Sequence, residues 1–339
     1  MAKTPREMLL LQRRSALVLG VLILACGLVG GALALGQGAK EKAAGLKVVV
    51  TVPPFKGLVE PLLPVGSSVT VLMKPGRSEH GYEFTPADMA ALAGADVFVY
   101  IGLGLEPRIE AALAKKPAGS RQIVCFAEVV GYEQPGGPKA AGQGEVDSHD
   151  HHHDDAHDHD HDKPDAIDPH LWLDPVLVEK LIPALHKAVK AAATARAPAS
   201  AAEVARLDLA ERTLIERVHA VDSDWTAQLA PFKGAAIVTH HNAFKRPAER
   251  YGFKIAAAIR EFEGSEPAPG DIAKVVAAIR EHNVQAIFCE PQYNQVAAQR
   301  IAASAGVRLA ALDPLGDGDW FKLMQTNLDS LTKNLAPSK

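Results

Sequence analysis

The sequence predicts an α/β protein of two lobes, each with a mostly parallel β-sheet flanked by helices, joined by one long rigid helix. Strand-like apolar runs alternate with helix-like segments in both halves of the chain, as in parallel sheets covered by helices. A helical pattern over residues 198–230 separates the two halves. With 339 residues, the chain is long enough to bury a core in each lobe.

The first 36 residues predict an export signal or a membrane anchor. Three arginines precede the apolar stretch 15–36, an order that is typical of secretory signals. Three outcomes stay open: cleavage after the A-x-A motif at 32–34, retention as an anchor through 15–36, and lipoprotein processing at Cys26. In each case the mature chain is expected to be periplasmic or otherwise extracytoplasmic.

The N-terminal lobe is predicted to span residues 46–197. It contains a loop at 134–166 that is rich in His and Asp and holds almost no apolar residue, so this loop cannot contribute to a core. Helices are predicted for "FKGLVEPLL", "PADMAALAGA" and "GLEPRIEAALAK". The expected strands are 46–52, 68–73, 96–102 and 121–126.

The linking helix is predicted to begin at Pro198 or Ser200 and to stop before Pro231. The C-terminal lobe, residues 231–339, repeats the alternation of strands and helices. One of its helices, "AFKRPAERYG", is expected to be interrupted near Pro247. The expected strands are 235–240, 254–259, 284–290 and 307–313.

Composition and motifs exclude several classes of function. The formal net charge of −4 and the lack of a basic tract predict no nucleic-acid partner. The sequence has no C-x-x-C pair, so Cys125 and Cys289 are interpreted as buried free thiols, although an exported protein permits a disulfide. No H-E-x-x-H, G-x-S-x-G or glycine-rich phosphate loop is present, which argues against an enzyme, including a metallohydrolase.

Histidines and carboxylates gather just after the predicted strands, where open α/β sheets bind their ligands. Imidazoles together with a carboxylate are a usual ligand set for zinc. The alternative for each histidine is a hydrogen-bonded surface residue, and for the last carboxylate a turn before a proline. The residues that follow strands are Glu79, His80, His240, His241 and Asp313, and His170 follows the long loop. Three other histidines, His186, His219 and His282, are predicted to be exposed on helices.

Several phrases, in the same order, resemble the periplasmic solute-binding proteins of zinc and manganese ABC transporters (cluster A-I, the ZnuA/TroA-like family). The resemblance runs from about Leu46 to Leu335. It implies a TroA-like metal-binding fold with a metal site in the cleft between the lobes. It also implies an ABC permease and its ATPase as partners of a monomer. The phrases are "TVPPFKGLVEPLL", "GRSEHGYEFTPADMAALAGADVFVYIGLGLEP", "DPHLWLDP", "HNAFKRPAERYG", "IFCEPQYN" and "LDPLG".

The resemblance implies four metal ligands in this chain: His80, His170, His241 and Asp313. Glu79 is an alternative to Asp313, or to a water, as the fourth ligand. Zinc-type members have a histidine at the position of His241, whereas manganese-type members usually carry a carboxylate there, and imidazole suits zinc. Zn²⁺ is therefore the predicted ion, with Mn²⁺ or an adhesin-like surface role as alternatives. The chain departs from the family at Arg108, Arg246 and Pro247, where members often have aromatic residues.

The run of histidines and aspartates before "DPHLW" is interpreted separately from these ligands. Its composition cannot bury a core, but its imidazoles can bind zinc weakly at several places. Two interpretations stay open: an auxiliary zinc collector or sensor of low affinity, and a loop with no essential role. The histidines concerned are His149, His151, His152, His153, His157, His159 and His161.

Overall fold

The computed structural model describes most of the chain that follows the predicted export segment. The described residues are 45–74, 76–80, 82–115, 121–132, 167–260 and 268–335. The predictions for residues 1–36, including Cys26, lie outside them, as do the predictions for the seven histidines from His149 to His161.

The first lobe is built on a parallel sheet of four strands. Its strand order is β2-β1-β3-β4, so the first strand of the chain lies inside the sheet. All four residues of β3 are buried, which explains its uninterrupted apolar sequence. The strands are β1 (Lys47–Val50), β2 (Ser68–Val71), β3 (Val97–Tyr100) and β4 (Gln122–Cys125).

The second lobe repeats this arrangement with a sheet of order β6-β5-β7-β8, again parallel throughout. Each strand lies within one of the ranges expected from the sequence. The predicted fold class, two α/β lobes with parallel sheets, is therefore confirmed. The strands are β5 (Ala236–Thr239), β6 (Lys254–Ala258), β7 (Ala286–Cys289) and β8 (Arg308–Ala311).

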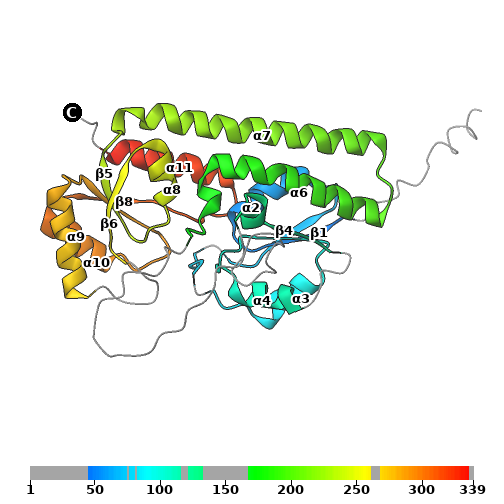
Figure 1. Ribbon diagram of the computed structural model, residues 1–339, viewed down its shortest axis with the longest axis horizontal. Helices are drawn as coiled ribbons and strands as arrows, with labels where there is room; N and C mark the ends of the chain where they lie inside the picture. Colours follow the sequence, from blue (N-terminus) through cyan, green and yellow to red (C-terminus); the bar gives the residue numbers. More distant parts are fainter. Residues whose placement is uncertain are drawn as a thin grey trace, which may run out of the picture. The chain divides into compact units, whose positions relative to one another are not determined.

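Helices connect the strands in both lobes (Figure 1). Those before the long helix are α2 (Pro54–Val59), η1 (Glu60–Leu62), α3 (Pro86–Ala93), α4 (Pro107–Lys115), α5 (Phe126–Val129), η2 (Leu171–Leu173) and α6 (Pro175–Arg196). Those after it are η3 (Ala230–Phe232), α8 (Lys245–Tyr251), α9 (Pro269–Glu281), α10 (Val296–Ala305) and α11 (Trp320–Asn334).

The predicted interruption near Pro247 is wrong. Pro247 is the third residue of α8, where a backbone N–H would have no partner inside the helix.

The long helix α7 (Ala201–Leu229) packs against elements of both lobes. Figure 1 shows it running alongside α6 and α11. The side chain of Ser200 caps its start by accepting a hydrogen bond from the N–H of Glu203. Its 29 residues correspond to a length of about 44 Å. One stripe of the helix is buried, as expected for an amphipathic helix that covers a core, and consists of Leu207, Leu214, Val218, Trp225 and Leu229.

Two buried tryptophans tie the lobes together through hydrogen bonds. The indole N–H of Trp172 donates to the carbonyl of Pro314 at 2.6 Å, and that of Trp320 donates to the carbonyl of Trp172 at 2.7 Å. The N–H of Gly57 donates to Gly318 at 2.8 Å, and a Cβ at Gly57 would lie only 2.9 Å from that oxygen. Because one contiguous apolar core includes residues of both lobes, large hinge movements are disfavoured.

Two further expectations from the sequence concern the buried cysteines and three helical histidines. Cys125 and Cys289 are buried and form no disulfide with each other, as predicted. His186 is only 7% exposed, so its predicted exposure is wrong, whereas His219 and His282 are exposed. His186 is buried because α6 packs against α7, which brings Asp208 and Glu211 to 3.1 and 2.9 Å from the two ring nitrogens. Among the helices of the described residues, none combines the length and apolarity needed to cross a bilayer.

Candidate metal centre

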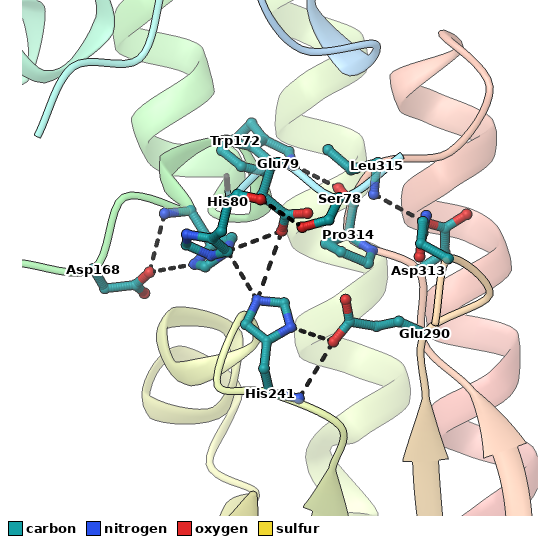
Figure 2. Close-up of polar contacts among 12 residues, drawn as sticks. Ser78, Glu79, His80, Asp168, Trp172, His241, Glu290, Asp313, Pro314 and Leu315 are labelled. Carbon is teal, nitrogen blue, oxygen red and sulfur yellow. Dashed lines mark hydrogen bonds and ion pairs between the residues drawn. The ribbon is translucent and has the colours of Figure 1, made fainter. Parts of the chain in front are cut away.

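Three histidines and one glutamate meet between the lobes, although they come from distant parts of the sequence. Glu79 and His80 lie between β2 and α3, His170 immediately precedes η2, and His241 lies two residues after β5. Each offers a ligand atom, and these four atoms lie within 4.8 Å of one another. Figure 2 shows Glu79, His80 and His241 converging, with Asp168 and Glu290 further out.

The spacing of the ring nitrogens suits a tetrahedral metal ion. The Nε2 atom of His170 lies 3.2 Å from Nε2 of His80 and 3.2 Å from Nε2 of His241. Zinc–nitrogen bonds of about 2.0–2.1 Å at tetrahedral angles would place ligand nitrogens about 3.3 Å apart. The carboxylate of Glu79 completes the set, because its Oε1 lies 3.1 Å from Nε2 of His170 and 3.6 Å from Nε2 of His241.

Two acidic side chains contact the Nδ1 atoms of two of the imidazole rings, on the side opposite the Nε2 atoms that face the centre. Oδ1 of Asp168 lies 2.7 Å from Nδ1 of His170 and accepts the backbone N–H of His170 at 3.0 Å. Oε1 of Glu290 contacts Nδ1 of His241 in the same way and accepts its backbone N–H at 3.3 Å. A proton on each Nδ1 leaves the lone pair of Nε2 directed at the centre. This carboxylate–histidine pairing is common among metal-binding histidines.

Glu79 is a buried but charged member of the cluster, with 1% of its surface exposed. Burial alone would raise the pKa of Glu79. The hydrogen bond with His170 and the charges of His170, His241 and His80 outweigh burial and lower the pKa to about 2. The group is therefore an anion at any physiological pH and contributes negative charge to the centre.

In the metal-free chain, the environment of His170 favours its protonated form, whereas that of Glu79 favours the deprotonated form. Burial would lower its pKa, but the hydrogen bonds and charges of Asp168 and Glu79 outweigh burial and raise the pKa to about 9. The pKa of Glu290 is raised well above its usual range by burial and by the charge of Glu79. Excess negative charge in the centre is thus balanced by protons, which a metal ion could replace.

The neighbouring histidine, His240, has a different environment from His241. Its ring packs against Tyr293 with 4.4 Å between the ring centroids, and it does not belong to the four-residue cluster. Burial, together with the charges of Arg260 and His241, lowers the pKa of His240 to about 4. Of the two adjacent histidines, the structure therefore brings His241 into the cluster, as the sequence-based assignment expects.

Asp313 lies outside the four-residue cluster, and its side chain is engaged elsewhere. Its Oδ1 accepts hydrogen bonds from Gln292 Nε2 at 2.6 Å and from the backbone N–H groups of Leu315 and Gly316 at 2.9 and 3.0 Å. These bonds form the turn that follows β8. The ligand role of Asp313 stays a prediction, and Glu79 is the carboxylate that the structure brings to the three imidazoles.

Asp168 and Glu290 were not expected from the sequence to contribute to the site, although Asp168 lies in "DPHLWLDP" and Glu290 in "IFCEPQYN". Glu290 directly follows β7, so the rule that located the histidines at strand ends applied to it as well. Asp168 lies two residues before His170, the spacing at which an aspartate accepts the following backbone N–H. The position of Glu290 after a strand and the spacing of Asp168 and His170 are both visible in the sequence. Only the fold shows which imidazole each carboxylate orients.

Comparison with known proteins adds three findings. A family model described as ZnuA, zinc-uptake complex component A periplasmic, matches residues 48–334. The chain is 28% identical over 306 residues to the zinc-binding protein AdcA of Streptococcus pyogenes serotype M3, covering 84% of this chain and 55% of AdcA. It is 25% identical over 334 residues to the manganese-binding lipoprotein MntA of Halalkalibacterium halodurans, covering 94% of this chain and 96% of MntA.

The fold is also shared with solved structures. The periplasmic zinc-binding protein TroA from Treponema pallidum superimposes with a TM-score of 0.64 at 21% identity, covering 85% of this chain and 98% of TroA. The chain spans about half the length of AdcA, whereas it covers nearly all of MntA and TroA.

Proposed function

Because the chain belongs to the family of the periplasmic zinc-uptake complex component A, we propose that it captures Zn²⁺ outside the cytoplasmic membrane and delivers it to an ABC permease for uptake. One observation carries this proposal: three imidazole Nε2 atoms and a carboxylate oxygen converge at distances that suit a tetrahedral ion. In this account Zn²⁺ is the cargo of the protein and not a resident cofactor.

We propose His80, His170 and His241 as three ligands and Glu79 as the fourth. Four protein ligands fill a tetrahedral zinc site, whereas catalytic zinc sites usually keep one position open for water or substrate. The arrangement thus supports a carrier and not a hydrolase. Asp313, the fourth ligand predicted from the sequence, lies outside the four-residue cluster, and its Oδ1 already accepts three hydrogen bonds.

The proposed partners are the membrane subunits of an ABC transporter and its ATPase, with this chain as a monomer that presents the ion. The periplasmic description of the family supports a site of action outside the cytoplasm. One relative, MntA, is named a lipoprotein, which keeps lipid attachment at Cys26 among the proposed outcomes for the N-terminal segment. The seven histidines from His149 to His161 are proposed as an auxiliary zinc collector of low affinity.

A competition experiment tests the proposed metal. The wild-type chain is expected to bind zinc in preference to manganese, because three imidazoles suit zinc better than an oxygen-rich set does. Replacing His241→Asp should shift the preference toward manganese, with His240→Asp as a matched control that leaves the preference unchanged. The measurement is metal content after equilibration with both ions. Unchanged zinc preference in His241→Asp would contradict the role given to that imidazole.

Zinc binding is expected to release about one proton from His170 at pH 7. The pKa of about 9 keeps this ring protonated in the metal-free chain, and a ligating nitrogen must lose its proton. Apparent zinc affinity should therefore rise with pH up to about 9. Conversely, the stability that the metal-free chain gains from this charge is complete below about pH 6.5 and is lost as the pH rises through about 9.

The proton count can be measured by calorimetry of zinc binding at pH 7 in buffers that differ in their heats of ionisation. Raising the pH to 9.5 should reduce the count, because His170 then loses its proton before zinc arrives. A binding enthalpy that is independent of the buffer at pH 7 would show that this ring is already neutral.

A further inference from the structure

Arg246 reaches from the second lobe to residues of the first lobe beside the metal centre. It lies in α8, and its side chain is 15% exposed. One terminal nitrogen, Nη2, donates to the backbone carbonyl of Asp168 at 2.6 Å, and the other, Nη1, donates to the hydroxyl of Tyr132 at 3.1 Å. Its Nε lies 3.4 Å from Oδ2 of Asp168, so the guanidinium and this carboxylate form an ion pair.

Asp168 links this arginine to the cluster. While Oδ2 faces Arg246, Oδ1 contacts Nδ1 of His170 at 2.7 Å and accepts the backbone N–H of His170 at 3.0 Å. Asp168 is itself largely buried, with 14% of its side chain exposed. Figure 2 shows Asp168 on the outer side of the imidazoles, on the face away from Glu79. The direction of the Nε2 lone pair of His170 thus depends on Asp168, and Arg246 of the second lobe holds Asp168 in place.

We propose that Arg246 is a positioning residue for metal capture: acting through Asp168, it fixes the ring of His170 from the opposite lobe. This inference rests on the proposed function and deepens it. An arginine suits the role because its planar fork can serve several acceptors at once in a fixed geometry. A lysine would keep the charge but could not hold the carbonyl and the carboxylate together. Metal binding at His170 is therefore coupled to the docking of α8 against the first lobe.

Removing the side chain of Arg246 is expected to loosen Asp168 and, through it, the imidazole of His170. Replacing Arg246→Ala should weaken zinc binding about 10–100-fold, mainly through faster dissociation, and Arg246→Lys should recover little of the loss. Tyr132→Phe removes only the contact to the hydroxyl and should bind zinc nearly as the wild type does. Arg250→Ala is the matched control, since Arg250 lies in the same helix and pairs with Asp222 at 2.7 and 2.8 Å.

The experiment measures zinc affinity and dissociation rate for these variants of the full chain, alongside Asp168→Asn and the double variant. If Arg246 acts through Asp168, then Arg246→Ala should have little further effect once Asp168 is Asn, so the two losses are not additive. Cobalt(II) bound to Arg246→Ala should show an altered visible spectrum, whereas Arg250→Ala should match the wild type. The spectrum reports ligand geometry, which a general loss of stability would not change.

Additive losses, or wild-type zinc affinity in Arg246→Ala, would overturn this inference. His170→Ala separates it from the proposed function. If His170→Ala loses tight zinc while Arg246→Ala keeps it, only the positioning role fails. If His170→Ala binds zinc as tightly as the wild type does, the proposed function itself fails.

Discussion

Replacing His241→Ala is expected to reduce zinc affinity by about 10²–10³-fold. A four-ligand zinc site contributes ~10–16 kcal/mol, or roughly 2.5–4 kcal/mol per ligand, which corresponds to that loss in Kd. The substitution also removes the imidazole that bridges the centre and Glu290, so the buried side chain of Glu290 keeps only the backbone N–H of residue 241 as a donor from that segment. Competition with a chelator of known zinc affinity is the suitable measurement, because tight binding exceeds the range of direct titration.

His240→Ala is the matched control for this prediction. Both substitutions remove a buried imidazole from the same segment, and the two residues are 3% and 9% exposed. The ring of His240, however, packs on Tyr293 and lies outside the cluster. We therefore expect His240→Ala to lower the stability of the metal-free chain while leaving zinc affinity close to that of the wild type. Equal losses of affinity in the two variants would contradict the assignment of His241.

The second large effect concerns the fourth ligand. Glu79→Gln should weaken zinc binding by about 10²-fold, because it replaces an anionic oxygen ligand by a neutral amide next to a divalent ion. The same substitution should leave the fold intact, since Gln keeps the size of the side chain. Zinc competition at pH 7, where Glu79 with its pKa of about 2 is ionised, measures the effect.

Asp313→Asn distinguishes the two candidate carboxylates. The amide oxygen of Asn can still accept the hydrogen bonds that Gln292, Leu315 and Gly316 donate, so the turn should persist. Zinc affinity is then expected to stay near that of the wild type. A large loss in Asp313→Asn together with a small one in Glu79→Gln would instead support the ligand set predicted from the sequence.

Much of the fold could be predicted from the sequence, because parallel strands that are buried on both faces have short, continuous apolar sequences. The segments "VFVY" and "AIFC" have all four residues buried, and both were recognisable without a structure. Errors arose where tertiary packing decides the outcome. His186 is polar and lies in a helix, but α7 covers it and supplies Asp208 and Glu211 as partners.

The site was less predictable than the fold, because strand ends show which side chains come near the centre but not where they point. Glu79 and Asp313 both follow strands, but hydrogen bonds in the turn after β8 engage the side chain of Asp313 away from the imidazoles. The contact of Arg246 with Asp168 joins residues 78 positions apart in two lobes. No local pattern encodes such a contact, since it depends on how α8 docks.

The central claim is that the tight site lies at His80, His170 and His241 and not in the run of histidines from 149 to 161. A zinc titration of the chain lacking residues 149–161, with a chelator as competitor, tests this claim most directly. We expect that one tightly bound zinc per chain remains and that only weaker binding disappears. Loss of the tight site on deletion, with His80, His170 and His241 intact, would contradict it.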